Sequence, residues 1–162
     1  MAEGDFLVPV ASALRTVGVQ AALDGTLVAA RPAGLLPVAV AVLDAGAQLV
    51  AFRRVDGCGV RHFEIARGKA QAALGMGIGS RVVRDRLKDR VAFQSAIAAA
   101  SDGRFIPVPG GVLILDATGQ AAVGVSGDAS DRDEYAAIMG IRAAGLAAHP
   151  DEPAANWQEA GL

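Results

Sequence analysis

Apolar and polar residues follow two different periods along this chain, and the change of period predicts a mixture of helices and strands. Residues 9–30 are rich in Ala, Leu and Val with polar residues at helical intervals, which predicts a helix weakened by Gly18 and Gly25. Two apolar runs, 38–43 and 49–55, are separated by five residues that include glycine. This spacing predicts an antiparallel hairpin whose first strand is central and whose second strand is half exposed.

The rest of the chain continues this mixture of elements. Helices are expected over residues 60–74, 81–88, 91–100 and 130–148, and a second hairpin over residues 112–116 and 120–125. Glycine on alternate positions from Gly75 to Gly79 provides a bend after the first of these helices. Ser130 is expected to cap the last helix, with Asp133 three residues on in the form of a capping box.

The order helix, hairpin, helices, hairpin, helix predicts an α/β fold of the α+β layered kind. One antiparallel sheet of about five strands would be flanked by helices, in three layers at most. Residues 105–108 are the candidate fifth strand, and Pro107 and Pro109 would confine that segment to an edge or a loop. No internal repeat or low-complexity linker divides the chain, so we expect a single domain over residues 1–162.

Composition supports a globular domain and excludes one class of partner. The chain has 162 residues, of which 52% are hydrophobic and 20% charged, which suits one domain with a sizeable core. Only 4% are aromatic, so small and branched side chains must fill that core. The formal net charge of −2 provides no electrostatic footprint for nucleic acid.

The location expected for the protein is the cytoplasm. The acidic first five residues lack the basic and apolar regions of a secretory signal, and no apolar run approaches the ~18 residues that span a bilayer. The only cysteine, Cys58, permits no internal disulfide, which agrees with a reducing compartment. We therefore expect a soluble protein with no membrane partner.

Five short motifs in order along the chain resemble a known family. They are Val-Leu-Asp-Ala-Gly at 42–46, Ile-Ala-Arg-Gly-Lys-Ala at 65–70, Gly-Arg-Phe-Ile-Pro-Val-Pro-Gly-Gly-Val at 103–112, Gly-Val-Ser-Gly at 124–127 and Asp-Arg-Asp-Glu at 131–134. With these motifs the chain resembles the GlcG/HbpS family of haem-binding or haem-degrading domains, which also occurs as the C-terminal domain of PduO-type cobalamin adenosyltransferases. The resemblance covers residues 36–147, so the first and last segments are expected to vary.

The resemblance implies more about the fold than about the chemistry. It implies a profilin-like sandwich, assembly into homo-oligomers from dimers to octameric rings, and a small-molecule ligand. Haem is the candidate cofactor that it implies, and no other cofactor is expected. Members of the family have different or unsettled activities, and a shared fold does not carry a shared chemistry.

Two ionisable residues share one stripe of the helix expected at 60–74. His62 and Lys69 lie seven residues apart among alanines, where they could place a base or a cation at the floor of a shallow pocket. In the alternative interpretation, Lys69 extends its charged end to solvent at a helix end and His62 is exposed in the first turn. His62 is the best candidate for an axial haem ligand, ahead of Cys58, Met76 and His149. These residues show no ligand spacing for any other metal.

An arginine and several acidic residues surround the glycine-rich motifs. Arg104 could bind a carboxylate ligand in bidentate fashion, or pair with Asp131, Asp133 or Glu134. Carboxylates at the start of a helix are favoured by its dipole, which accounts for about half of the acidic cluster at 128–134. Asp131 and Glu134 remain candidates for acid–base chemistry together with Lys69.

Four small residues could present backbone N–H groups to an anionic oxygen. Tight turns are the favoured interpretation, because the motifs match no phosphate-binding signature. These residues are Gly110, Gly111, Ser126 and Gly127. The side chains of Met76 and Met139 are expected in the core, and Trp157 is expected to dock on its own or a neighbouring subunit.

Three hypotheses for function follow. The first is a small-molecule-binding protein, with haem as a candidate ligand, accessory to a catabolic or biosynthetic pathway. The second is a cofactor-independent enzyme that uses Lys69, Arg104, Asp131 and Glu134 for acid–base chemistry, such as isomerisation, hydration or elimination, on a small oxygenated or carboxylate metabolite. The third is a structural partner of a neighbouring enzyme. In the first two, Arg104, Asp131 and Glu134 would face Lys69 and His62 across one cleft.

Overall fold

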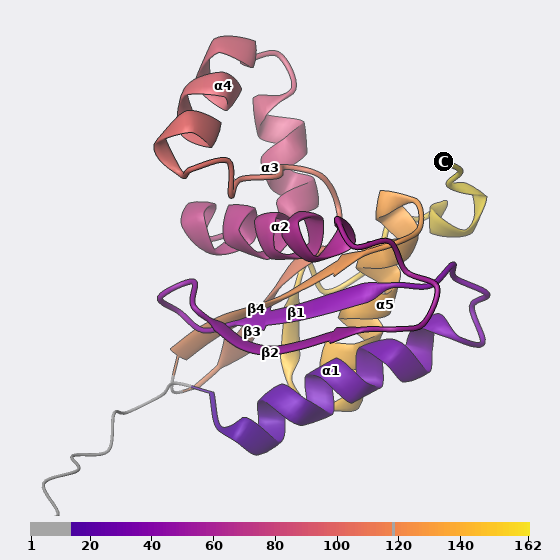
Figure 1. Cartoon of the computed structure of the whole chain (residues 1–162). Coiled ribbons are helices and arrows are strands. Elements are labelled where there is room, and N and C mark those ends of the chain that lie inside the picture. The colour runs from indigo at the N-terminus through magenta and orange to yellow at the C-terminus, as the bar shows by residue number, and fades with distance from the viewer. Residues whose placement is uncertain (1–13, 118) are drawn as a thin grey trace, which may run out of the picture.

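A five-stranded antiparallel sheet forms the centre of the molecule (Figure 1). The computed structural model describes residues 14–117 and 119–162. The strand order in the sheet is β2-β1-β4-β3-β5. The strands are β1 (Ala39–Leu43), β2 (Leu49–Arg54), β3 (Gly111–Asp116), β4 (Gly119–Ser126) and β5 (Ala147–His149). Both hairpins predicted from the apolar runs are therefore confirmed, and the predicted α/β layered fold is confirmed with them.

Burial along the first hairpin follows from its place in the sheet. Every residue of β1 is buried, because β2 and β4 flank it and helices cover both of its faces. In contrast, β2 is an edge strand, and Leu49, Val50 and Phe52 all remain exposed on it. The prediction of a central first strand is thus confirmed, whereas the second strand, predicted to be half exposed, is exposed at five of its six residues.

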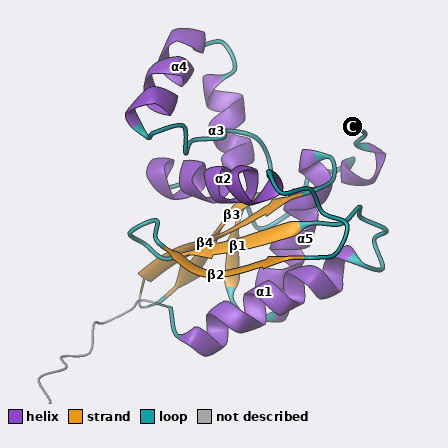
Figure 2. Ribbon diagram, viewed as in Figure 1, coloured by secondary structure: helices purple, strands orange, loops and turns teal. Residues whose placement is uncertain are grey.

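Helices form layers on both faces of the sheet (Figures 1 and 2). On one face α1 and α5 pack together against the strands; on the other, α2 lies across β4, β1 and β3, with α3 and α4 beyond it. The helices are α1 (Thr16–Ala30), α2 (His62–Met76), α3 (Ser80–Leu87), α4 (Val91–Ala100) and α5 (Ser130–Ala143), followed by the short 3-10 helix η1 (Trp157–Glu159). No helix within the described ranges is long and apolar enough to cross a bilayer.

Glycines allow the helices to approach their neighbours closely. A Cβ atom on Gly25 of α1 would lie 2.7 Å from the carbonyl oxygen of Gly140 in α5. On the opposite face, a Cβ on Gly124 of β4 would collide with the carbonyl oxygen of Ala66 in α2, and one on Gly111 would collide with that of Lys69. Gly25 lowers the helix propensity of α1. Its lack of a side chain is needed for contact with α5, which is distant in the sequence.

The fifth strand is β5, and the expectation of a strand at 105–108 is wrong. That segment is a loop whose Phe105 side chain is buried beside Val83 and Leu87. The last helix ends at Ala143, and Ala147–His149 pairs with β3 instead of continuing the helix as predicted. The alanines gave a helical composition, but pairing with an otherwise open strand edge decides their structure.

Three smaller expectations are also corrected or limited by the structure. Ala129 precedes α5 and no side chain caps it, so Ser130 is the first helical residue and not the cap. Met76 is exposed at the end of α2 and does not contribute to the core, whereas Met139 is half-buried. The part of the predicted first helix at 9–13 lies outside the described residues.

Candidate functional site

A buried ion pair connects the helices on the two faces of the sheet. Lys69 Nζ of α2 lies 2.9 Å from Asp133 Oδ2 in the first turn of α5. The two side chains are 3% and 0% exposed. Burial raises the pKa of Asp133 to about 6, although the charge and hydrogen bond of Lys69 oppose that rise. Lys69 therefore holds its partner carboxylate and does not extend to solvent.

The same carboxylate also organises the loop before α5. Asp133 Oδ1 accepts a hydrogen bond of 3.0 Å from the backbone N–H of Asp128. The side chain of Asp128 in turn accepts hydrogen bonds from the N–H groups of Leu36 and Ala129, and forms an ion pair of 3.2 Å with Arg132. Burial alone would raise the pKa of Asp128, but these donors hold it below its usual value.

A second buried carboxylate lies at the other side of the first turn of α5. Glu134 is fully buried, and its Oε2 is 2.8 Å from Nε of Arg81 at the start of α3. The contact is an ion pair without an aligned hydrogen bond, and no other described group bonds to either oxygen of Glu134. Burial raises the pKa of Glu134 to about 7 against the opposing charge of Arg81. Arg81 also donates through Nη2 to the carbonyl oxygen of Glu152 in the tail.

Each carboxylate of the acidic cluster thus lies within 4.0 Å of a cation, although Arg84 also pairs with Asp85 at 2.9 Å. Asp131, which is partly exposed, lies 3.9 Å from Arg84 of α3. The four pairs are Asp128 with Arg132, Asp131 with Arg84, Asp133 with Lys69, and Glu134 with Arg81. This pairing explains how four acidic side chains are tolerated within seven residues, and it ties α2, α3 and the loop before α5 together.

His62 is oriented by a residue of the sheet. It is the first residue of α2, and its Nδ1 lies 2.7 Å from Oγ of Ser126, the last residue of β4. No hydrogen bond joins Nε2 to any residue within the described ranges. With Nδ1–H donated to Ser126, the lone pair of Nε2 is available to a ligand. His62 is half-buried, so the ring combines a fixed orientation with access from solvent.

The residues near His62 in the chain include apolar side chains and a thiol. Val60 is largely exposed, and Phe63 packs edge to face on Phe52 of β2, with ring centroids 4.7 Å apart. Burial raises the pKa of the Cys58 thiol, and the charge of Asp133 adds to that rise against the opposing charge of Arg54. The thiol is therefore neutral near pH 7, which makes it a weak metal ligand.

Arg104 stands apart from the other predicted site residues. It is exposed in the segment after α4, and its guanidinium forms no ion pair with any described residue. The pair with Asp131, Asp133 or Glu134 is not formed, because Arg84, Lys69 and Arg81 occupy those carboxylates. The structure therefore separates the predicted cleft into buried ion pairs, the His62–Ser126 pair and a solvent-exposed arginine.

The glycine motifs serve turns and close packing. Gly110 has a φ of +119°, and a Cβ there would lie 2.9 Å from Cδ of Lys69. The N–H of Gly111 donates to Oγ of Ser80 at 2.8 Å, so it is not available to an anion. At Gly127 a Cβ would collide with the carbonyl oxygen of Pro37. The alternative favoured from the sequence, in which these glycines are structural, agrees with this geometry.

Two residues that participate in this region have no distinctive signal in the sequence. Ser80 accepts from Gly111 and donates to the carbonyl oxygen of Val108, and Arg81 neutralises Glu134. Both lie in a short amphipathic helix whose charges are typical of a solvated surface. Their partners are 28 to 71 residues away in the chain, so local patterns do not reveal them. Among the described residues, no cluster of three or more His, Cys, Asp or Glu side chains is arranged to hold a metal ion.

Comparison with known proteins identifies relatives of this chain. The family model described as "Haem degrading protein HbpS-like" matches residues 16–142. No protein with curated information matches the chain. Among solved structures, the chain is similar to HbpS, with 26% identity, a TM-score of 0.68 and coverage of 88% of this chain and 96% of that one.

Two further structures share the fold at lower identity. The PduOC–haem complex has a TM-score of 0.75 and 20% identity, and the match covers 84% of this chain and 98% of that one. Klebsiella pneumoniae protein ORFY has a TM-score of 0.73 and 18% identity, with coverage of 89% and 98%. The five-stranded sheet and its helical layers are therefore an arrangement common to these proteins.

Proposed function

Because this chain belongs to the HbpS-like family, we propose that it is a haem-binding protein in which Nε2 of His62 is the ligand to the iron. Two comparisons support the proposal: the name of the family refers to haem, and one structure with the same fold is a haem complex. Such a protein would be accessory to the enzymes of a catabolic or biosynthetic pathway.

The observation that carries the proposal is the 2.7 Å contact between His62 Nδ1 and Ser126 Oγ. Histidines that bind metals almost always have their second ring nitrogen hydrogen-bonded, because this bond fixes the tautomer and the ring orientation. The contact orients the ring, and in the tautomer that donates Nδ1–H to Ser126 the Nε2 lone pair is available to the iron. The exposed apolar side chains of Val60 and Phe52 provide surface suited to a porphyrin. When bound, haem would supply an iron centre whose reactivity depends on its axial ligand.

The other candidate ligands are less suited to this role. The pKa of Cys58 is raised by burial, so its thiol stays protonated at neutral pH. Met76 is the last residue of α2, whereas His62 is the first, about 20 Å away at the rise of a helix. His149 belongs to β5, the edge strand at the opposite side of the sheet from β2. His62 alone combines a fixed ring with a nitrogen that has no partner among the described residues.

Titration of the purified protein with haemin tests the proposal. We expect the Soret band to shift on binding, and His62→Ala to abolish the shift or move it to the spectrum of loosely associated haemin. His149→Ala is the matched control, because it removes the other histidine of the chain and should leave the spectrum unchanged. Loss of the shift in His149→Ala with retention in His62→Ala would refute the assignment.

The proposal includes assembly into a homo-oligomer, between a dimer and an octamer, of a single-domain chain in the cytoplasm. Helix α4 supports it, because this mainly apolar helix has no buried residue in the isolated chain and Val91 is 70% exposed. A second copy of the chain would cover such a face. Sedimentation equilibrium tests the assembly, and a clean monomer at micromolar concentration would contradict it.

A further inference from the structure

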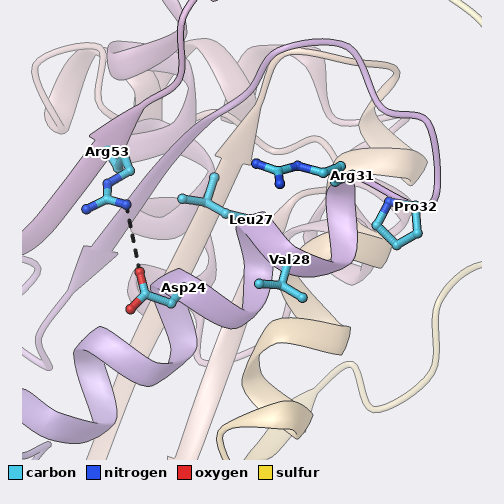
Figure 3. A pocket seen from close by; sticks show the side chains of 6 residues that line it. All are labelled: Asp24, Leu27, Val28, Arg31, Pro32 and Arg53. Atoms are coloured by element: carbon cyan, nitrogen blue, oxygen red, sulfur yellow. Dashed lines mark ion pairs between the residues drawn. The ribbon is translucent and has the colours of Figure 1, made fainter.

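Two adjoining grooves lie on the face of the sheet that α1 covers. Their volumes are about 510 Å³ and 310 Å³, within the range of about 300–1,000 Å³ typical of small-molecule sites. Both grooves are lined by Leu27 near the end of α1, by Arg31 directly after that helix, and by Arg53 of β2. Figure 3 shows Arg31 extending from the end of α1 toward Arg53, with Leu27 between them. The two grooves therefore share one cationic rim.

Apolar side chains form the walls of both grooves. Val28 of α1 is 71% exposed in the first groove, and Leu36 is 48% exposed in the second. Val38 and Val55 line the second groove beside the sheet. A molecule seated here would remove this apolar surface from water, which contributes roughly 25 cal/mol for each Å² covered.

The two arginines of the rim form only one weak ion pair with the described residues of the chain. No ion pair or hydrogen bond joins the guanidinium of Arg31 to any residue in the part of the chain that the structure describes. Arg53 lies 4.0 Å from Asp24 Oδ1, with both side chains about half exposed, and the same oxygen already accepts a hydrogen bond of 3.0 Å from Gln20. An exposed pair at this distance contributes little stability, so both guanidiniums are available to a ligand.

The charges at the rim select the kind of ligand. Two guanidiniums and the one carboxylate of Asp24 leave a single positive charge, which suits an anion with one negative charge. A guanidinium presents a planar fork of donors that matches a carboxylate in bidentate fashion. We propose that these grooves form a binding site for a small monocarboxylate with an apolar body, held by Arg31 and Arg53 and covered along its length by the walls.

This site is distinct from the one proposed for haem. Arg31, Arg53 and the walls belong to the α1 face of the sheet, whereas His62 begins α2 on the opposite face. The monocarboxylate site does not depend on the haem proposal, and its test reads out a different ligand. A protein with both sites would hold a haem and an organic acid at the same time.

Calorimetric titration of the full chain with octanoate, and separately with 1-naphthoate, tests the proposal. We expect at least one of the two acids to bind, and the pair distinguishes an aliphatic from an aromatic body. Octan-1-ol, which has the same chain without the charge, should bind at least tenfold more weakly than octanoate. Absence of heat from both acids, or equal binding of octanol and octanoate, would overturn the proposal.

Three variants locate the binding. Arg31→Gln and Arg53→Gln should each raise the Kd of the acid about tenfold, because each removes a charge-assisted hydrogen bond. Val28→Glu keeps both arginines and should weaken binding by repelling the anion. Arg86→Gln is the matched control, because Arg86 is exposed on α3 and lines neither groove. An unchanged Kd in Arg31→Gln, Arg53→Gln and Val28→Glu would overturn the assignment.

A haemin titration of Arg31→Gln separates this proposal from the previous one. All three substituted side chains are exposed or at the surface, so the variants should keep the fold, and thermal unfolding checks that they do. We expect the Soret shift to persist in Arg31→Gln while acid binding weakens. Loss of both, together with displacement of octanoate by haemin, would show one shared site and would contradict the separation proposed here.

Discussion

Lys69 Nζ lies 2.9 Å from Asp133 Oδ2, and this contact joins α2 to the start of α5 with almost no exposure of either side chain. Lys69→Met keeps most of the length of the side chain but leaves Asp133 buried without its cation. We expect the free energy of unfolding at pH 7.5 to fall by about 3–5 kcal/mol. At pH 5 the loss should be smaller, because Asp133 then takes up a proton. Urea denaturation at the two pH values measures both quantities.

The double variant Lys69→Met/Asp133→Asn is the control for this prediction. Because it removes both charges, it should recover much of the stability lost in Lys69→Met. An equal loss at pH 5 and pH 7.5, or no recovery in the double variant, would contradict the interpretation of the pair as a structural one.

The raised pKa of Glu134 predicts that the free energy of unfolding decreases as the pH rises toward neutrality. Burial raises its pKa from 4.5 to about 7 in the folded chain, so the folded state binds more protons than the unfolded state between these values. Stability must then decrease with increasing pH across this window, by an amount on the order of 3 kcal/mol for this group. Glu134→Gln should flatten the dependence between pH 5 and pH 8, as measured by urea denaturation.

The matched control is Glu159→Gln, an exposed glutamate in η1, which should leave the pH dependence as it is in the wild type. Asp133 contributes in the same direction, because its pKa is also raised, so a residual slope is expected in Glu134→Gln. An unaltered slope in Glu134→Gln would show that this carboxyl is ionised in the fold at pH 5.

Close approach of α2 to the sheet predicts a severe effect of Gly124→Ala. The added Cβ would collide with the carbonyl oxygen of Ala66, and backbone cannot move aside as a flexible side chain can. We expect a loss of about 3 kcal/mol in the free energy of unfolding. Gly75→Ala is the control, because Gly75 is exposed in α2 and no atom lies within 4 Å of the position of an added Cβ. This substitution should leave the free energy of unfolding unchanged or raise it by up to about 1 kcal/mol.

The C-terminal tail docks through a pair of aromatic rings, which agrees with the expectation that Trp157 packs on protein. Trp157 stacks on Tyr135 of α5 with ring centroids 3.6 Å apart and planes 9° from parallel. Because the chain has one tryptophan, its fluorescence reports this contact directly. Tyr135→Ala should shift the emission to longer wavelength and lower stability by roughly 1 kcal/mol. An unchanged emission maximum would show that other contacts hold the tail.

The sequence predicted the parts of the fold that depend on local pattern. The hairpins, the central place of β1 and the exposure of β2 follow from the length of the apolar runs and from the glycines between them. The fifth strand was assigned wrongly, because Ala147 and Ala148 have helical composition and only the open edge of β3 makes them a strand. Such long-range pairing leaves no local trace in the chain.

In the candidate site, too, local sequence motifs were predictive and long-range partners were not. The motifs around Lys69, Ser126 and Glu134 singled out residues that the structure places at the joints between elements. Their partners were not predictable, because Lys69 and Asp133 are 64 residues apart in the chain, as are His62 and Ser126. The cation of Glu134 is Arg81, in a helix whose pattern resembles an ordinary solvated surface.

Ser126 holds the ring of His62, the iron ligand of the proposed haem site, through the contact between Oγ and Nδ1. Ser126→Ala removes the oxygen that holds Nδ1 and should weaken haemin binding about tenfold or more, while the Soret maximum of the bound form stays close to that of the wild type. This combination distinguishes a residue that positions the ligand from the ligand itself. A variant that binds haemin as tightly as the wild type would show that the contact has no role in binding.

The most direct test of the central proposal is the Soret spectrum of haemin-loaded His62→Gly before and after the addition of imidazole. If Nε2 of His62 is the iron ligand, the variant should lose the wild-type spectrum, and imidazole in the vacated space should restore it. A wild-type spectrum in His62→Gly without imidazole would contradict the proposal.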